Sequence, residues 1–169
     1  MNKNIITAIV IGIIIISGLS LFGLSRGPKP IIQPIPFSHE KHVEELDLEC
    51  SSCHTQVTKH PRATLPSIKI CYECHSEPMT ETEIENTLLS YTNENREIPW
   101  KRVYKVPDHV YFSHRRHVTI GNVLCESCHG EMGQLTEPPS APLINITMDY
   151  CMECHEEHKI TNDCLACHR

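Results

Sequence analysis

The stretch Phe112-Ser-His114-Arg-Arg-His117-Val-Thr-Ile-Gly-Asn-Val-Leu-Cys125-Glu-Ser-Cys128-His129 decides the fold of this chain. It ends in the pattern C-x-x-C-H, and five copies of that pattern use all ten cysteines among the 169 residues. The copies are Cys50-Ser-Ser-Cys53-His54, Cys71-Tyr-Glu-Cys74-His75, Cys125-Glu-Ser-Cys128-His129, Cys151-Met-Glu-Cys154-His155 and Cys164-Leu-Ala-Cys167-His168.

Each C-x-x-C-H copy is typical of a covalent attachment site for c-type haem. Two thiols add to the two vinyl groups of one haem, and the histidine that follows reaches the iron as its proximal ligand. Structural zinc sites pair cysteines and histidines differently, and a disulfide framework does not need a histidine after every second cysteine. The sequence therefore predicts five covalently bound haem c groups, and with them maturation outside the cytoplasm.

The chain also contains a duplication. Phe37-Ser-His39-Glu-Lys-His42-Val and the C-x-x-C-H copy at 50–54 return without a gap 75 positions later, at 112–129. The copy at 71–75 returns 80 positions later, at 151–155. Such repetition is a strong organising signal, and it predicts two two-haem modules, at 37–75 and 112–155, plus a fifth haem at 164–168.

The repeated histidines outside the C-x-x-C-H copies are candidates for the second axial ligands. His39 and His42, like His114 and His117, are three residues apart, so neighbouring rings on one short helix can face two different irons. We assign His39 and His114 to the haems at Cys50 and Cys125, and His42 and His117 to the second haem of each module.

The fifth haem has no counterpart in the repeat. Its second ligand must come from His158, His109, His60 or a methionine, and we favour His158 because it lies six residues before Cys164.

Residues 1–26 contain an uncharged run from Ile5 to Leu24, long enough to cross a bilayer as a helix. The prediction is one N-terminal transmembrane helix, with a cleaved signal peptide as the competing interpretation. Four prolines in 27–36 predict an extended tether, and 37–169 forms the pentahaem domain. A short amphipathic helix is expected near 81–91, with Thr80-Glu-Thr-Glu83 resembling a capping box.

The composition beyond residue 26 limits the function. Only 42 of those 143 residues are apolar and not cysteine, so the haems must supply much of the core. The predicted fold is mainly irregular and α-helical. The net charge of this region is about −8, so it offers no excess of positive charge to bind phosphate backbones, which argues against nucleic-acid binding.

The pattern F-S-H-x-x-H-V, seven residues before a haem motif, resembles the cytochrome c7 and c3 class of multihaem cytochromes. The longer stretch Ile98-Pro-Trp-Lys-Arg-Val-Tyr-Lys-Val-Pro-Asp-His-Val-Tyr-Phe-Ser-His-Arg-Arg-His-Val118 is similar to the membrane-anchored multihaem subunit of alternative complex III and of the related quinone reductase complex. The resemblance implies partners of three kinds: iron-sulfur and molybdopterin-enzyme-like subunits, polytopic quinol-binding subunits and a soluble electron carrier. It places the haem domain on the periplasmic face of the cytoplasmic membrane.

The sequence thus predicts an electron-carrier subunit with no catalytic residues of its own. Two alternatives stay open at this point. One is a self-contained, membrane-anchored quinol dehydrogenase cytochrome, and the other is a multihaem reductase, which needs an iron with an open position.

Overall fold

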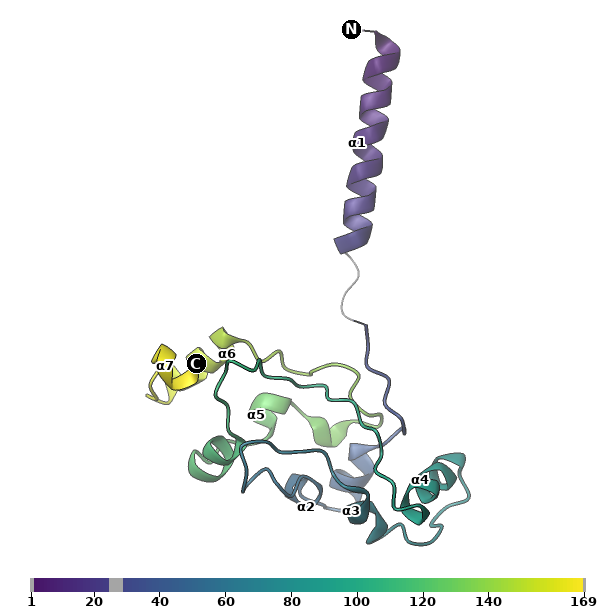
Figure 1. Cartoon of the computed structure of the whole chain (residues 1–169), viewed down its shortest axis with the longest axis vertical. Coiled ribbons are helices and arrows are strands. Elements are labelled where there is room, and N and C mark those ends of the chain that lie inside the picture. Colours follow the sequence, from purple (N-terminus) through teal and green to yellow (C-terminus); the bar gives the residue numbers. More distant parts are fainter. Residues whose placement is uncertain (1, 25–28, 169) are drawn as a thin grey trace. The chain divides into compact units, whose positions relative to one another are not determined.

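A computed structural model describes residues 2–24 and 29–168 of the chain (Figure 1). The chain divides into two compact units, Met1–Pro30 and Ile31–Arg169. Residues 25–28, where the predicted anchor ends and the predicted tether begins, lie outside the described residues. The boundaries at 26 and 36 stay predictions.

The first unit contains one helix, α1, at Lys3–Leu24. A membrane crossing needs a helix of about 20 predominantly apolar residues. In the part of the chain that the structure describes, no helix combines the length and the apolar composition of a membrane span. The predicted N-terminal transmembrane helix is therefore wrong.

The second unit is built from short helices joined by long irregular connections (Figure 1). Its α-helices are α2 Cys50–Cys53, α3 Ile68–Tyr72, α4 Glu83–Asn93, α5 Glu126–His129, α6 Met148–Glu157 and α7 Cys164–Cys167. Over the residues described, the chain forms no strand, and its one recorded β-bridge pairs Val110 with His168. The mainly irregular and helical architecture agrees with the prediction.

The two repeats fold alike at their His-x-x-His segments. Each forms a short π-helical segment, η1 at Lys41–Glu45 and η2 at Arg115–Ile120. This wider turn, with hydrogen bonds between residues five apart, replaces the ordinary helix that the sequence suggests.

Helix α4 begins two residues later than expected. Thr82 is its N-cap, and the Thr82 hydroxyl accepts a hydrogen bond from the backbone N–H of Glu85 at 3.3 Å. The capping sequence is therefore Thr82-Glu-Ile-Glu85, shifted by two positions from the predicted Thr80-Glu-Thr-Glu83.

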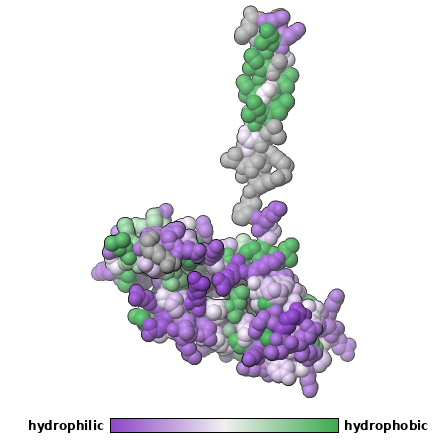
Figure 2. Space-filling view, viewed as in Figure 1, coloured by the Kyte–Doolittle hydropathy of each residue, from purple (hydrophilic) through white to green (hydrophobic). Residues whose placement is uncertain are grey.

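The apolar core of the second unit is thin. Among the described residues, the buried apolar side chains are Ile35, Val57, Ile68, Leu89 and Ile98. Three of these form one cluster, Ile35, Ile68 and Ile98, against which Trp100 and Tyr91 pack. The face of this unit in Figure 2 is mostly hydrophilic. So small a core is consistent with a domain that packs around prosthetic groups.

Candidate haem-attachment sites

All ten cysteines carry free thiols, and each pair lies within or at the ends of one helical turn. This turn also positions the histidine that follows. The backbone N–H of His54, His75, His129 and His168 donates to the carbonyl of the first cysteine of its motif at 2.8–2.9 Å. The remaining motif, at 151–155, lies inside α6. The repeated turn thus presents two thiols and one imidazole together in each motif.

The structure brings the added histidines opposite the motif histidines. The ring centroids are 6.3 Å apart for His42 and His75, 6.4 Å for His114 and His129, and 6.1 Å for His117 and His155. A metal between two imidazoles, with bonds of about 2 Å on each side, separates their ring centroids by roughly 6 Å. Each of these three pairs therefore leaves room for one iron.

His39 lies near His54, and its environment keeps its ring neutral. Burial, followed by repulsion from His54 and His42, lowers the pKa of His39 to about 4. Burial likewise lowers the pKa of His54, His114 and His129. A neutral imidazole is the form that binds a metal. Three of the expected pairs lie with their rings facing, the fourth, His39 with His54, interacts electrostatically, and ligation stays a proposal.

Hydrogen bonds at Nδ1 set the orientation of the rings. The Nδ1–H of His42 donates to the Ser38 carbonyl at 2.8 Å, and that of His117 donates to the Ser113 carbonyl at 2.9 Å. The Nδ1–H of His114 donates to the Pro61 carbonyl at 3.1 Å. A donor bond at Nδ1 leaves the lone pair of Nε2 for a metal, which is the usual second-shell arrangement.

The repeated phenylalanine holds each His-x-x-His pair in place. Phe37 stacks on His42, with ring centroids 4.5 Å apart, and meets His39 edge-on at 4.9 Å. Phe112 makes the same two contacts with His117 and His114, both at 4.8 Å. The sequence shows this phenylalanine in the repeat, but only the structure shows its role.

The fifth site differs from the expectation. His158 makes no ring contact with His168 among the described residues, and its Nδ1–H donates to the carbonyl of Cys154 at 2.9 Å. The ring that lies on His168 is that of His109, with centroids 5.5 Å apart and planes 19° from parallel. Backbone pairing brings them together, since Tyr111 N–H donates to the Cys167 carbonyl at 2.7 Å. No local sequence signal joins segments so far apart in the chain.

The structure also shows where two other candidate ligands of the fifth haem lie, His60 and the methionine that begins α6. The backbone carbonyl of His60 accepts from Arg115 N–H at 3.3 Å, so this residue lies where the two modules meet. Met148 is 61% exposed.

Thiols of different motifs lie near one another. Burial and then nearby Cys74 raise the pKa of Cys53, while burial and then Cys50 raise the pKa of Cys125 to about 11. Burial and then Cys154 raise the pKa of Cys128.

At the other end, burial and then Cys167 raise the pKa of Cys151. Adjacent thiols thus connect the motifs in the order 71–75, 50–54, 125–129, 151–155 and 164–168.

The residues fit covalent haem better than a directly bound metal. In the described part of the chain, no three side chains of the metal-binding types converge on one point. Structural zinc usually needs four such ligands, whereas a porphyrin needs only two axial ligands from the protein. Paired free thiols, facing imidazoles and a thin core together define a multihaem c-type cytochrome.

Comparison with known proteins gives the same class. The family model for cytochrome c7 and related cytochrome c matches residues 35–95 and 110–169. The chain is 30% identical over 161 residues to the menaquinone reductase multihaem cytochrome c subunit of Nitratidesulfovibrio vulgaris, covering 81% of this chain and 77% of that protein. The chain belongs to the cytochrome c7 and related cytochrome c family, whose members bind haem covalently and transfer electrons.

Proposed function

We propose that this chain holds five c-type haems and relays single electrons between a quinone-reactive complex and another redox partner. When bound, haem supplies one-electron chemistry at its iron. The observation that carries the proposal is the set of facing imidazole pairs, in which a histidine outside the motifs lies opposite a motif histidine with room for one iron between them. Several such sites in one small domain suit a relay, because an electron can pass from one haem to the next.

The histidine pairs support transfer without substrate binding. Two imidazoles face each other at His42 and His75, at His114 and His129 and at His117 and His155. We propose that His39 with His54 and His109 with His168 complete the set. Two histidines of the chain would then hold each iron, so a substrate would find no open coordination position.

The similarity to a menaquinone reductase subunit supports a place in a quinone-linked complex. We propose that this chain assembles with the other subunits of such a complex and that its haem domain matures and works outside the cytoplasm. A soluble carrier would exchange electrons with the domain. Beyond residue 26 the net charge is about −8, and haem propionates add to it, which favours a carrier with a positive docking surface.

Electron paramagnetic resonance of the oxidised, haem-loaded chain tests this function. We expect only low-spin ferric signals, with no change on adding cyanide. A large high-spin fraction that binds cyanide would instead indicate a reductase with an open site. Rapid haem reduction by a menaquinol analogue with the purified chain alone would indicate a self-contained quinol dehydrogenase, whereas a relay needs the quinone-reactive subunits.

A further inference from the structure

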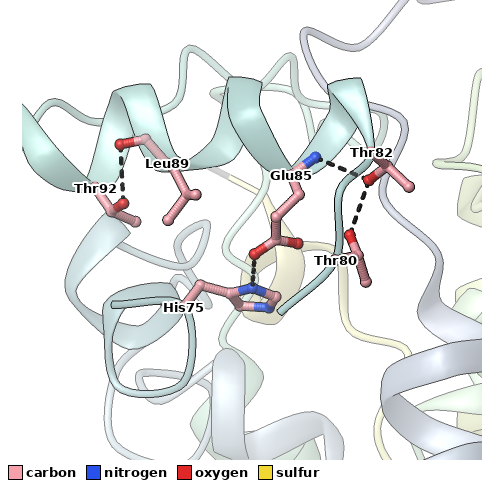
Figure 3. Close-up of polar contacts among 6 residues, drawn as sticks. All are labelled: His75, Thr80, Thr82, Glu85, Leu89 and Thr92. Carbon is pink, nitrogen blue, oxygen red and sulfur yellow. Dashed lines mark hydrogen bonds and ion pairs between the residues drawn. The ribbon is translucent and has the colours of Figure 1, made fainter. Parts of the chain in front are cut away.

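A buried carboxylate contacts one of the five motif histidines. The Nδ1–H of His75 donates to Oε1 of Glu85 at 2.9 Å (Figure 3). The side chains are 19% and 9% exposed, respectively, so water competes weakly for the contact. Hydrogen bonds to an ionised partner are about twice as strong as neutral ones.

The position of Glu85 in α4 explains how the carboxylate reaches His75. Glu85 is the third residue of the helix, and its backbone N–H is capped by the Thr82 hydroxyl, which also contacts the Thr80 hydroxyl at 3.0 Å (Figure 3). In a capping box, the third-residue glutamate reaches back to the N-cap backbone N–H. Here the Glu85 carboxylate points to the histidine instead. The helix N-terminus also favours a negative charge at this position.

Two of the other motif histidines donate to neutral backbone carbonyls over longer distances. The Nδ1–H of His54 donates to the Thr64 carbonyl at 3.4 Å, and that of His155 donates to the Thr161 carbonyl at 3.3 Å. Among the described residues, His75 is the one motif histidine with a carboxylate on Nδ1. The 80-residue shift that relates the motifs at 71–75 and 151–155 places Leu165 at the position of Glu85. The two modules therefore differ here.

A carboxylate on the remote nitrogen of an axial histidine increases the basicity of that ligand. A more basic ligand stabilises ferric over ferrous iron, and second-shell hydrogen bonding is one of the ways a protein sets haem potential. We propose that Glu85 is a positioning residue that lowers the reduction potential of the haem attached at Cys71 and Cys74 relative to the equivalent haem at Cys151 and Cys154. This inference rests on the proposed haem attachment.

The motif at 71–75 neighbours the other motif of its own module, since Cys74 lies near Cys53. Glu85 therefore makes the haem site at 71–75 more reducing than its counterpart in the second module. The duplicated modules thereby differ in haem reduction potential, although the equivalent histidine rings lie at similar distances, 6.3 Å for His42 and His75 and 6.1 Å for His117 and His155.

The test is a spectroelectrochemical titration of the haem-loaded chain, comparing wild type with Glu85→Gln and Glu83→Gln. Glutamine keeps the size of the side chain and can accept the same hydrogen bond, but it removes the charge. Glu83 lies in the same helical turn and is exposed, so Glu83→Gln is a control for the loss of charge.

We expect Glu85→Gln to raise one of the five potentials by at least a tenfold change in the ferric–ferrous equilibrium, which is 59 mV for one electron. Glu83→Gln should leave all five unchanged. If Glu85→Gln fails to load haem, Glu85→Asp replaces it and should raise the same potential by less. Unchanged potentials in the haem-loaded variant, or an equal shift in Glu83→Gln, would overturn the inference. A wild-type chain without covalent haem would contradict the proposed function instead.

Discussion

Replacing His109 with alanine should convert one haem in five from low spin to high spin. The His109 ring lies 5.5 Å from the His168 ring and nearly parallel to it, and no second imidazole is seen on His168 among the described residues. Removing it leaves one iron with an open position and the other four with two imidazoles. The expected magnitude is therefore the loss of one fifth of the low-spin ferric signal, counted over five motifs.

The assay is electron paramagnetic resonance with spin integration on the oxidised, haem-loaded variant, together with cyanide titration. One equivalent of cyanide per chain should bind to His109→Ala and restore the low-spin signal. His158→Ala is the matched control, because His158 is an exposed histidine of the same C-terminal region that bonds to the Cys154 carbonyl. The reasoning is refuted if His158→Ala opens the site and His109→Ala does not.

Three further predictions concern stability and are measured by denaturant unfolding of the haem-loaded chain. Ile68 is 2% exposed, so Ile68→Ala should lower the free energy of unfolding by about 2–5 kcal/mol. The control Ile32→Ala, at a side chain that is 75% exposed, should change that free energy by less than about 0.5 kcal/mol. Equal effects of the two substitutions would contradict the assigned core. Thr82→Ala removes the N-cap of α4 and should lower the free energy of unfolding by about 1 kcal/mol. An unchanged free energy would mean that the Thr82 hydroxyl does not stabilise the start of α4. Phe112→Leu and Phe37→Leu should each lower the free energy of unfolding by about 1 kcal/mol more than the loss of buried apolar area explains, because each ring stacks on a histidine in the same way. A large difference between the two variants would show that the phenylalanine has different roles in the two modules.

The haem motifs and the duplication can be recognised in the sequence because both depend on short, fixed spacings. The contacts of His42 and His117 follow from the repeat for the same reason. The fifth site could not be found this way, since His109 reaches His168 only through backbone pairing between Tyr111 and Cys167. Proximity in sequence favours His158, whose ring makes no contact with His168 among the described residues.

Two other features needed the structure. The contact between His75 and Glu85 depends on where α4 begins, and the two overlapping Thr-x-x-Glu patterns give different starts. The N-terminal apolar run suggests a membrane crossing by its length, whereas within the described residues no helix meets that requirement.

The most direct test of the account is the intact mass of the chain under denaturing conditions, after expression in a host that attaches haem c. Denaturation removes any haem held only by its iron and keeps haem held by thioether bonds. The account predicts the polypeptide mass plus five haems, with all ten cysteines consumed. A smaller number of haems, or thiols that still react with an alkylating reagent, would contradict it.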